Sequence, residues 1–198
     1  MHLADIHPAL AKMSSHPAVS DARAITYVAT YPSMRALGSA PGAISADRFN
    51  QLVVLAYGWM PRVARIDLRH MPSALIELNA AKLATVPPAA ISSLVRCLRS
   101  VVGASKVLHF VNHEVFPIWD SRIETFRLQG VPPYSHMKDL WNYQRYVRDV
   151  HSLRADSGFA AFYKGFQAAM NARLAVLGIP AYAISEVRAI EAAAFELS

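Results

Sequence analysis

The residue types with the clearest capacity for chemistry lie in one segment, 87–127, which reads PPAAISSLVRCLRSVVGASKVLHFVNHEVFPIWDSRIETFR. We predict that a helix covers 88–101, that Gly103 interrupts it with a tight turn, and that a second helix covers 105–111. The extended sequence FPIW then leads to Asp120 at the start of a third helix. The predicted order is helix, glycine turn, helix, extended link and helix.

The turn around Gly103 is a predicted anion site. Backbone N–H groups at the start of a helix have no partners within the helix, and the helix dipole also favours negative charge there. Two cations flank the turn, because Arg99 precedes it and Lys106 follows it. A solvated or salt-bridged lysine is the alternative for Lys106.

Asp120 is a predicted helix N-cap. An aspartate before Ser-Arg-Ile-Glu satisfies the first N–H groups of a helix, and Glu124 adds a second acidic group to the first turn. A role in chemistry is compatible with this capping role.

The segment resembles the helix-hairpin-helix superfamily of DNA base-excision glycosylases. VVGASK is similar to a reduced form of the family's hairpin, and FPIWDSRIETF is similar to the stretch that follows it in adenine glycosylases. The resemblance implies that Gly103, Ala104 and Ser105 hold a DNA phosphate. It also implies that Lys106 attacks the sugar carbon and that Asp120 stabilises the positive charge developing on the sugar. The segment also resembles a set of uncharacterised bacterial proteins.

Aromatic and basic residues elsewhere add candidate DNA contacts. Trp59 is followed by Arg62, Arg65 and Arg69, and an aromatic ring beside arginines suits stacking on an unstacked base together with phosphate contacts. Trp119, in the FPIW link, is a second candidate for stacking. The alternatives are that both tryptophans pack in the interior and that the arginines form one solvated helical face.

We predict neither a metal nor a cofactor. His109 and His113 are four residues apart, which suits a metal pair on a continuous helix, but no third ligand has a matching position, so packed histidines are the favoured interpretation. The chain contains no phosphate-binding Gly-x-x-x-x-Gly-Lys loop and no Gly-x-Ser-x-Gly serine motif. Its one cysteine, Cys97, excludes a disulfide framework.

Composition limits the class of protein. The chain has 198 residues, of which 54% are hydrophobic, and a formal net charge of +6. No apolar run is long enough for a membrane span, and the N-terminus lacks an apolar signal core, so we expect a cytoplasmic protein without membrane contact. A mildly basic chain rich in arginine is compatible with a phosphate-bearing partner.

Apolar residues recur at helical spacing throughout the chain, and no segment alternates with a period of two. We therefore predict an all-α domain of about eight or nine helices over 19–198, preceded by a loosely attached arm over 1–18. Two stripes are clear: one in 49–56 and an aromatic one in 159–174. Ser45 and Ser185 are predicted N-caps.

The sequence alone leaves two functions open. The first is a DNA-binding protein with a helix-hairpin-helix-like element and the activity of a divergent base-excision glycosylase. The second is a non-catalytic α-helical protein that acts through protein contacts, for example in a bacterial defence system. A homodimer that buries the aromatic stripe of 159–174 is compatible with either function.

Overall fold

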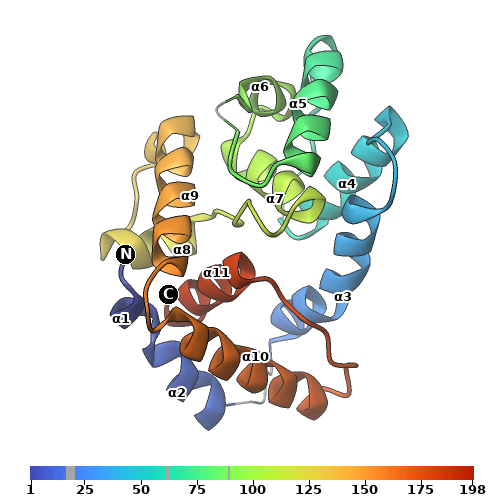
Figure 1. Cartoon of the computed structure of the whole chain (residues 1–198). Helices are drawn as coiled ribbons and strands as arrows, with labels where there is room; N and C mark the ends of the chain where they lie inside the picture. Colours follow the sequence, from blue (N-terminus) through green and yellow to red (C-terminus); the bar gives the residue numbers. More distant parts are fainter. Residues whose placement is uncertain (17–20, 61–62, 89) are drawn as a thin grey trace.

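A computed structural model describes residues 1–16, 21–60, 63–88 and 90–198 (Figure 1). The described residues form eleven α-helices, two 3₁₀ helices and no strand, which confirms the all-α class. The α-helices are α1 Leu3–Ile6, α2 Pro8–Ser15, α3 Ala22–Ser39, α4 Ala46–Gly58, α5 Met71–Leu83, α6 Ser92–Leu98, α7 Val101–Val111, α8 Ser121–Leu128, α9 Leu140–Arg154, α10 Phe159–Val176 and α11 Glu186–Leu197, and the 3₁₀ helices are η1 Leu68–His70 and η2 His136–Lys138.

Helix α7 lies near the centre of the fold, with α5 and α6 above it, α4 to its right and α11 below it in Figure 1. It packs against α3, α4, α5, α6 and α9, and nearly all of its residues are buried. Helix α3 passes very close to it, because Gly38 has no side chain at the point where the carbonyl of Phe110 lies. The central position explains why α7 is apolar around most of its circumference.

The predicted apolar stripes are the faces that the helices bury. In α4, the side chains of Phe49, Leu52, Val53 and Ala56 are fully buried. Ser45 caps α4 by accepting a hydrogen bond from the N–H of Arg48, as predicted. These apolar groups belong to one continuous cluster of buried side chains that extends through the molecule.

Gly103 does not form the predicted turn, and the break between α6 and α7 lies at Arg99 and Ser100. Helix α6 ends at Leu98, and the next residue, Arg99, adopts the left-handed conformation with φ of 50°. Ser100 caps α7 by accepting from the N–H of Gly103 at 2.9 Å. Gly103 therefore lies inside a continuous helix and does not interrupt it. The reason for a glycine is packing, because a Cβ there would meet the hydroxyl of Tyr57 at 2.5 Å.

The expected loose arm is wrong for residues 1–16. This segment forms α1 and α2, and the side chains of Ile6, Ala9 and Met13 are fully buried against α10 and α11. Lys12 also donates a hydrogen bond to the carbonyl of Glu196 on α11. The two helices raise the count above the eight or nine predicted, and residues 17 and 18 lie outside the described part of the chain.

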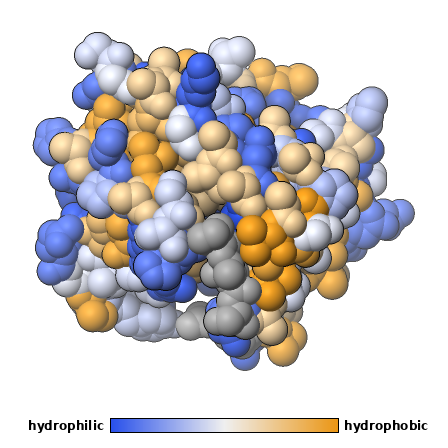
Figure 2. Space-filling view, turned by 90° about the horizontal axis from the view of Figure 1, so that it is seen from below, coloured by the Kyte–Doolittle hydropathy of each residue, from blue (hydrophilic) through white to orange (hydrophobic). Residues whose placement is uncertain are grey.

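The phenylalanine side chains of α10 are buried within a single copy of the chain. Phe159, Phe162 and Phe166 are at most 2% exposed and contact one another in sequence. A homodimer that buries these rings is therefore contradicted. The surface seen from below, where α2 and α10 lie, mixes apolar and hydrophilic side chains (Figure 2). Among the described helices, none has both the length and the apolar character that a membrane crossing requires.

Candidate functional site

The side chain of Lys106 lies inside the protein. It projects from the middle of α7 and is 6% exposed. No carboxylate lies within ion-pair distance of its ammonium among the described residues, and Nζ lies 5.9 Å from the centroid of the Trp59 ring. A buried lysine without a direct counter-ion is costly, so this position calls for an explanation in terms of chemistry.

Burial lowers the pKa of the Lys106 ammonium below its ordinary value. The charges of Asp120 and Glu191 oppose this shift, and the charge of Arg188 adds to it. These effects require that the four groups lie close enough to interact through the protein interior. Lys106 and Asp120, the two residues for which a chemical role was predicted, therefore interact through their charges, although they form no ion pair among the described residues.

Asp120 caps α8, as predicted. Its Oδ1 accepts a hydrogen bond from the N–H of Ile123 at 3.0 Å. The link that leads to it is held by Ser105, whose hydroxyl accepts from the N–H of Trp119 at 3.1 Å and donates to the carbonyl of Val102 at 2.8 Å. Ser105 thus fixes Asp120 relative to α7, the helix that carries Lys106.

Helix α11 adds an ion pair that the sequence analysis did not identify. Glu191 is 2% exposed, and its Oε1 accepts from the guanidinium of Arg188. Its Oε2 is buried and has no hydrogen-bond partner among the described residues. Burial raises the pKa of Glu191, although Arg188 opposes the shift. The sequence carried a signal for this residue, because Glu191 falls on the apolar stripe of α11 with Val187 and Ala194.

Tyr31 on α3 joins α7 to α11. Its hydroxyl lies 2.9 Å from Nε2 of His109, and the guanidinium of Arg188 lies 5.0 Å from the centroid of its ring. His109 Nδ1 lies 2.7 Å from the carbonyl of Phe116 and must donate to it. Burial lowers the pKa of His109, which favours a neutral ring whose Nε2 accepts from the hydroxyl of Tyr31. His109 is thus a packed histidine, as favoured from the sequence.

His109 on α7 and His113, just after the end of α7, make stability depend on pH. Burial lowers the pKa of His109 well below its ordinary value, and burial with the charge of Arg35 lowers the pKa of His113 to about 4. The unfolded chain therefore binds more protons than the folded chain below about pH 6.5. The stabilisation is present above that pH and is lost as the pH falls.

We expect the free energy of unfolding to decrease by about 1.5 kcal/mol between about pH 6.5 and about pH 5 from His113 alone, with His109 adding to the loss. Urea unfolding at both pH values measures this change. A His109→Asn variant should show a smaller decrease than the natural chain. An equal or larger decrease in the variant would contradict the assignment of His109 as a neutral, buried group.

The two tryptophans do not offer free faces for a base. Trp119 is fully buried, and its Nε1 donates to Glu124 at 2.8 Å. Trp59 is 8% exposed, and its Nε1 donates to Thr30 at 3.0 Å. The prediction that a base stacks on Trp119 is therefore wrong. The ring of Trp59 is also largely buried and lies beside Lys106.

The predicted phosphate-binding turn has no free N–H groups at its expected place. Gly103, Ala104 and Ser105 are buried in α7. The N–H of Gly103 donates to the hydroxyl of Ser100, and the N–H of Ala104 donates to the backbone carbonyl of Ser100 at 3.0 Å. The prediction for these three residues is therefore wrong, because the helix begins two residues earlier than Gly103.

The predicted arginine contacts lie on the surface near the start of α7. Arg99 is exposed and bonds Asp67 at 3.1 Å, and Arg69 bonds both oxygens of the same carboxylate. Arg65 is exposed but lies in a non-helical segment, so the predicted helical face of arginines is wrong for the described residues. Arg62 lies outside the described residues.

Comparisons with other proteins do not assign this site. No family model, curated protein or solved structure matches the chain. Within the described residues, no group of three or more His, Cys, Asp or Glu side chains could hold a metal ion. A function must therefore be argued from the arrangement of Lys106, Asp120 and their neighbours.

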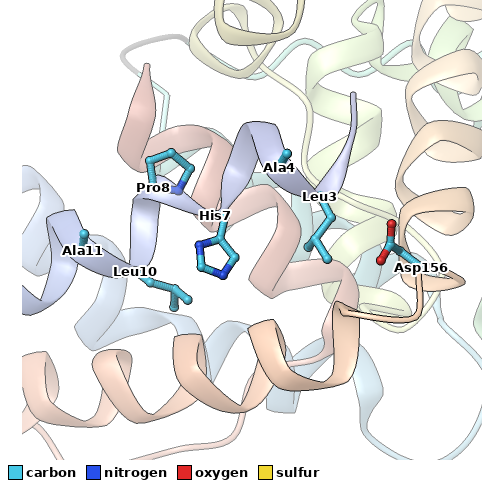
Figure 3. A pocket seen from close by; sticks show the side chains of 7 residues that line it. All are labelled: Leu3, Ala4, His7, Pro8, Leu10, Ala11 and Asp156. Atoms are coloured by element: carbon cyan, nitrogen blue, oxygen red, sulfur yellow. The ribbon is translucent and has the colours of Figure 1, made fainter.

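Two surface depressions stand apart from these residues. The first, of about 720 Å³, is lined mainly by apolar side chains of α1 and α2, with His7 between Leu3 and Leu10 and with Asp156 at one side (Figure 3). The second, of about 480 Å³, is lined by charged residues that include Arg35, Glu114 and Arg154. Neither includes Lys106 or Asp120, so the candidate site is a buried cluster of polar groups near the centre of the fold.

Proposed function

We propose that this protein binds DNA and acts at the sugar carbon C1′ through the amine of Lys106, as a divergent relative of base-excision glycosylases. The observation that supports the proposal is the buried Lys106 ammonium without an ion pair, in the field of Asp120. Burial favours the unprotonated amine, which is the nucleophilic form. An amine without this shift would be almost entirely protonated at neutral pH.

In the proposed reaction, the Lys106 amine attacks C1′, and the bond from C1′ to the base breaks. The bonding electrons leave with the base, which takes up a proton. The bond from C1′ to the ring oxygen O4′ then breaks, and O4′ takes up a proton from the nitrogen of Lys106. The sugar ring is thereby opened, and a protonated imine joins Lys106 to C1′. The carboxylate of Asp120 stabilises the positive charge that develops on the sugar. Because Lys106 is buried, the nucleotide must leave the base stack to reach it.

The exposed arginines near the start of α7 are the proposed phosphate contacts. Arg65, Arg69, Arg96 and Arg99 lie on this surface, and Asp67 partly neutralises two of them. Binding through such groups releases counterions and therefore weakens steeply with salt.

The first test is binding to a labelled duplex with an abasic-site analogue, titrated at several salt concentrations beside an undamaged duplex. We expect tighter binding to the analogue, since its extruded sugar needs no unpairing of a base. Equal binding to both duplexes would contradict recognition of a sugar site. Absence of binding at low salt would overturn the DNA proposal as a whole.

The salt dependence gives a prediction for Arg69 and Arg99. A double substitution of both to alanine should reduce the slope of log K against log salt by about 2, because each arginine is expected to neutralise one phosphate. Fluorescence anisotropy with the analogue duplex measures the slope. Arg148→Ala together with Lys164→Ala removes two exposed charges on α9 and α10 and serves as the control. An equal loss of slope in the control would contradict a localised contact surface.

A protein-contact module is the second candidate function. It is favoured by the absence of the predicted turn at Gly103 and by large apolar side chains that are exposed on α4, α5 and the segments next to them. These are Val54, Leu55, Val63, Leu68, Ile76, Leu83 and Val86. Such exposure is typical of docking surfaces. This candidate predicts that Lys106 has no reactivity beyond that of an exposed lysine.

A further inference from the structure

We propose that the second surface depression, which Arg35 and Glu114 line, binds a small zwitterion of the α-amino acid class. The carboxylate of the ligand pairs with Arg35, and its ammonium pairs with Glu114. The depression has a volume of about 480 Å³, which is enough for one such molecule. Lys106 does not line this depression, so the inference does not depend on the proposed function.

The first argument is that Arg35 is a cation without a carboxylate partner. It lies on α3 and is half-buried, and no ion pair joins it to an acidic group among the described residues. Its Nη1 donates to the carbonyl of Ala183 at 2.6 Å. A guanidinium has five N–H donors in one plane, so the remaining donors can hold a ligand carboxylate at two points.

The second argument is that Glu114 is an anion without a charged partner. Its side chain is 59% exposed, and its Oε1 lies 3.3 Å from Nδ1 of His113. This Nδ1 forms no hydrogen bond with any described residue. His113 is neutral at neutral pH, since burial and the charge of Arg35 lower its pKa to about 4. The Glu114 carboxylate is therefore open to the ammonium of a ligand.

The third argument is the balance of charge in the depression. Arg35 and Glu114 line it together but form no ion pair with each other. The other two charged groups there, Arg154 and Glu186, are paired at 2.7 Å. A ligand with a single charge leaves either the unpaired cation or the unpaired anion without a partner. A zwitterion matches both charges.

The walls of the depression are held in place by hydrogen bonds within the chain. Tyr163 on α10 donates to the carbonyl of Ile184 at 2.7 Å, and Ser185 donates to the carbonyl of His113 at 2.7 Å. A site that is already formed loses less conformational entropy when a ligand binds. Tyr163 and Ile184 also line the depression, which favours a ligand with an apolar side chain.

The test titrates the ¹⁵N-labelled full chain at neutral pH with leucine, isocaproate or isoamylamine and follows its amide signals by NMR. The three compounds share one branched apolar group, but isocaproate lacks the ammonium and isoamylamine lacks the carboxylate. We expect leucine to bind at least about tenfold more tightly than either, as for one charged hydrogen bond. The signals that shift should include those of residues 113–114 and 183–186, which line the depression. Equal affinities for leucine and a singly charged compound, or no binding of leucine at about 10 mM, would overturn the inference.

Substitutions of the two unpaired residues assign the two charges. Arg35→Gln should weaken leucine binding by about tenfold or more and leave isoamylamine binding unchanged. Glu114→Gln should weaken leucine binding to a similar extent and leave isocaproate binding unchanged. Arg23→Gln is the matched control, because it removes an exposed cation near the start of the same helix as Arg35. Equal losses of leucine binding in Arg23→Gln and Arg35→Gln would contradict a site in this depression. The comparison of the three compounds uses the natural chain alone, so it decides the inference even where a variant fails to fold.

Discussion

Substituting Lys106 by methionine should abolish covalent trapping of the protein on abasic DNA. In the natural chain, borohydride reduces the imine between Lys106 and C1′ and leaves a stable crosslink that migrates slowly in a denaturing gel. We expect a loss of at least about 100-fold in the variant, because no other lysine shares the burial that favours the free amine. Methionine has a similar length and is apolar, so the fold should tolerate it.

Lys164→Met is the matched control for this experiment. Lys164 is exposed on α10, and its removal should leave the crosslink yield unchanged. Equal yields from the natural chain and from Lys106→Met would show that another amine forms the crosslink. That result would favour the protein-contact function over the enzymatic one.

The largest expected effect on stability comes from Gly38→Ala. A Cβ at this position would overlap the backbone carbonyl of Phe110, which cannot rotate away as a side chain can. Helix α3 must therefore move from α7, the central helix of the core. We expect a loss of about 3 kcal/mol or more in the free energy of unfolding, at the upper end of the range for overpacking. Urea denaturation monitored by circular dichroism measures it.

Gly165→Ala is the contrasting variant. Its Cβ would lie 3.5 Å from the methyl groups of Leu10, which is an ordinary contact, and Gly165 is inside α10. We expect a gain of about 0.5–1 kcal/mol from the higher helix propensity of alanine. If Gly38→Ala were as stable as the natural chain, the close packing of α3 on α7 would be wrong.

Periodicity and capping chemistry predicted much of the fold because these signals are local. The stripe of 49–56 is buried, and Ser45, Asp120 and Ser185 cap helices as expected. Each of these features depends on residues that lie within one or two helical turns of one another. The class of the fold follows from such signals, since no segment had the alternation of a strand.

The wrong predictions concern positions whose surroundings are set by packing that a local sequence pattern does not show. Gly103 was interpreted as a turn, but Tyr57 on α4 requires a glycine there, and no local pattern could indicate this contact. Trp119 was considered for stacking, but Glu124 binds its indole N–H inside the protein. The arm over 1–18 was expected to be loosely attached, yet three apolar side chains anchor its residues 1–16.

The candidate site was predicted in part. Lys106 and Asp120 were identified from the sequence, but their electrostatic coupling depends on how α7 and α8 pack. The contribution of Glu191 and Arg188 required the fold, because α11 lies far along the chain. The apolar stripe of α11 was nevertheless a usable signal, since a glutamate on a buried helical face needs a partner.

The protonation state of Lys106 tests the account most directly. Lysines labelled with ¹³C at Cε can be titrated by NMR, with Lys106→Met to assign the signal. We predict that Lys106 titrates below about 10.4, the value for an exposed lysine, and that Asp120→Asn lowers its pKa further because it removes an opposing charge. A Lys106 pKa at or above that of exposed lysines would contradict the proposal that the fold supplies a nucleophilic amine.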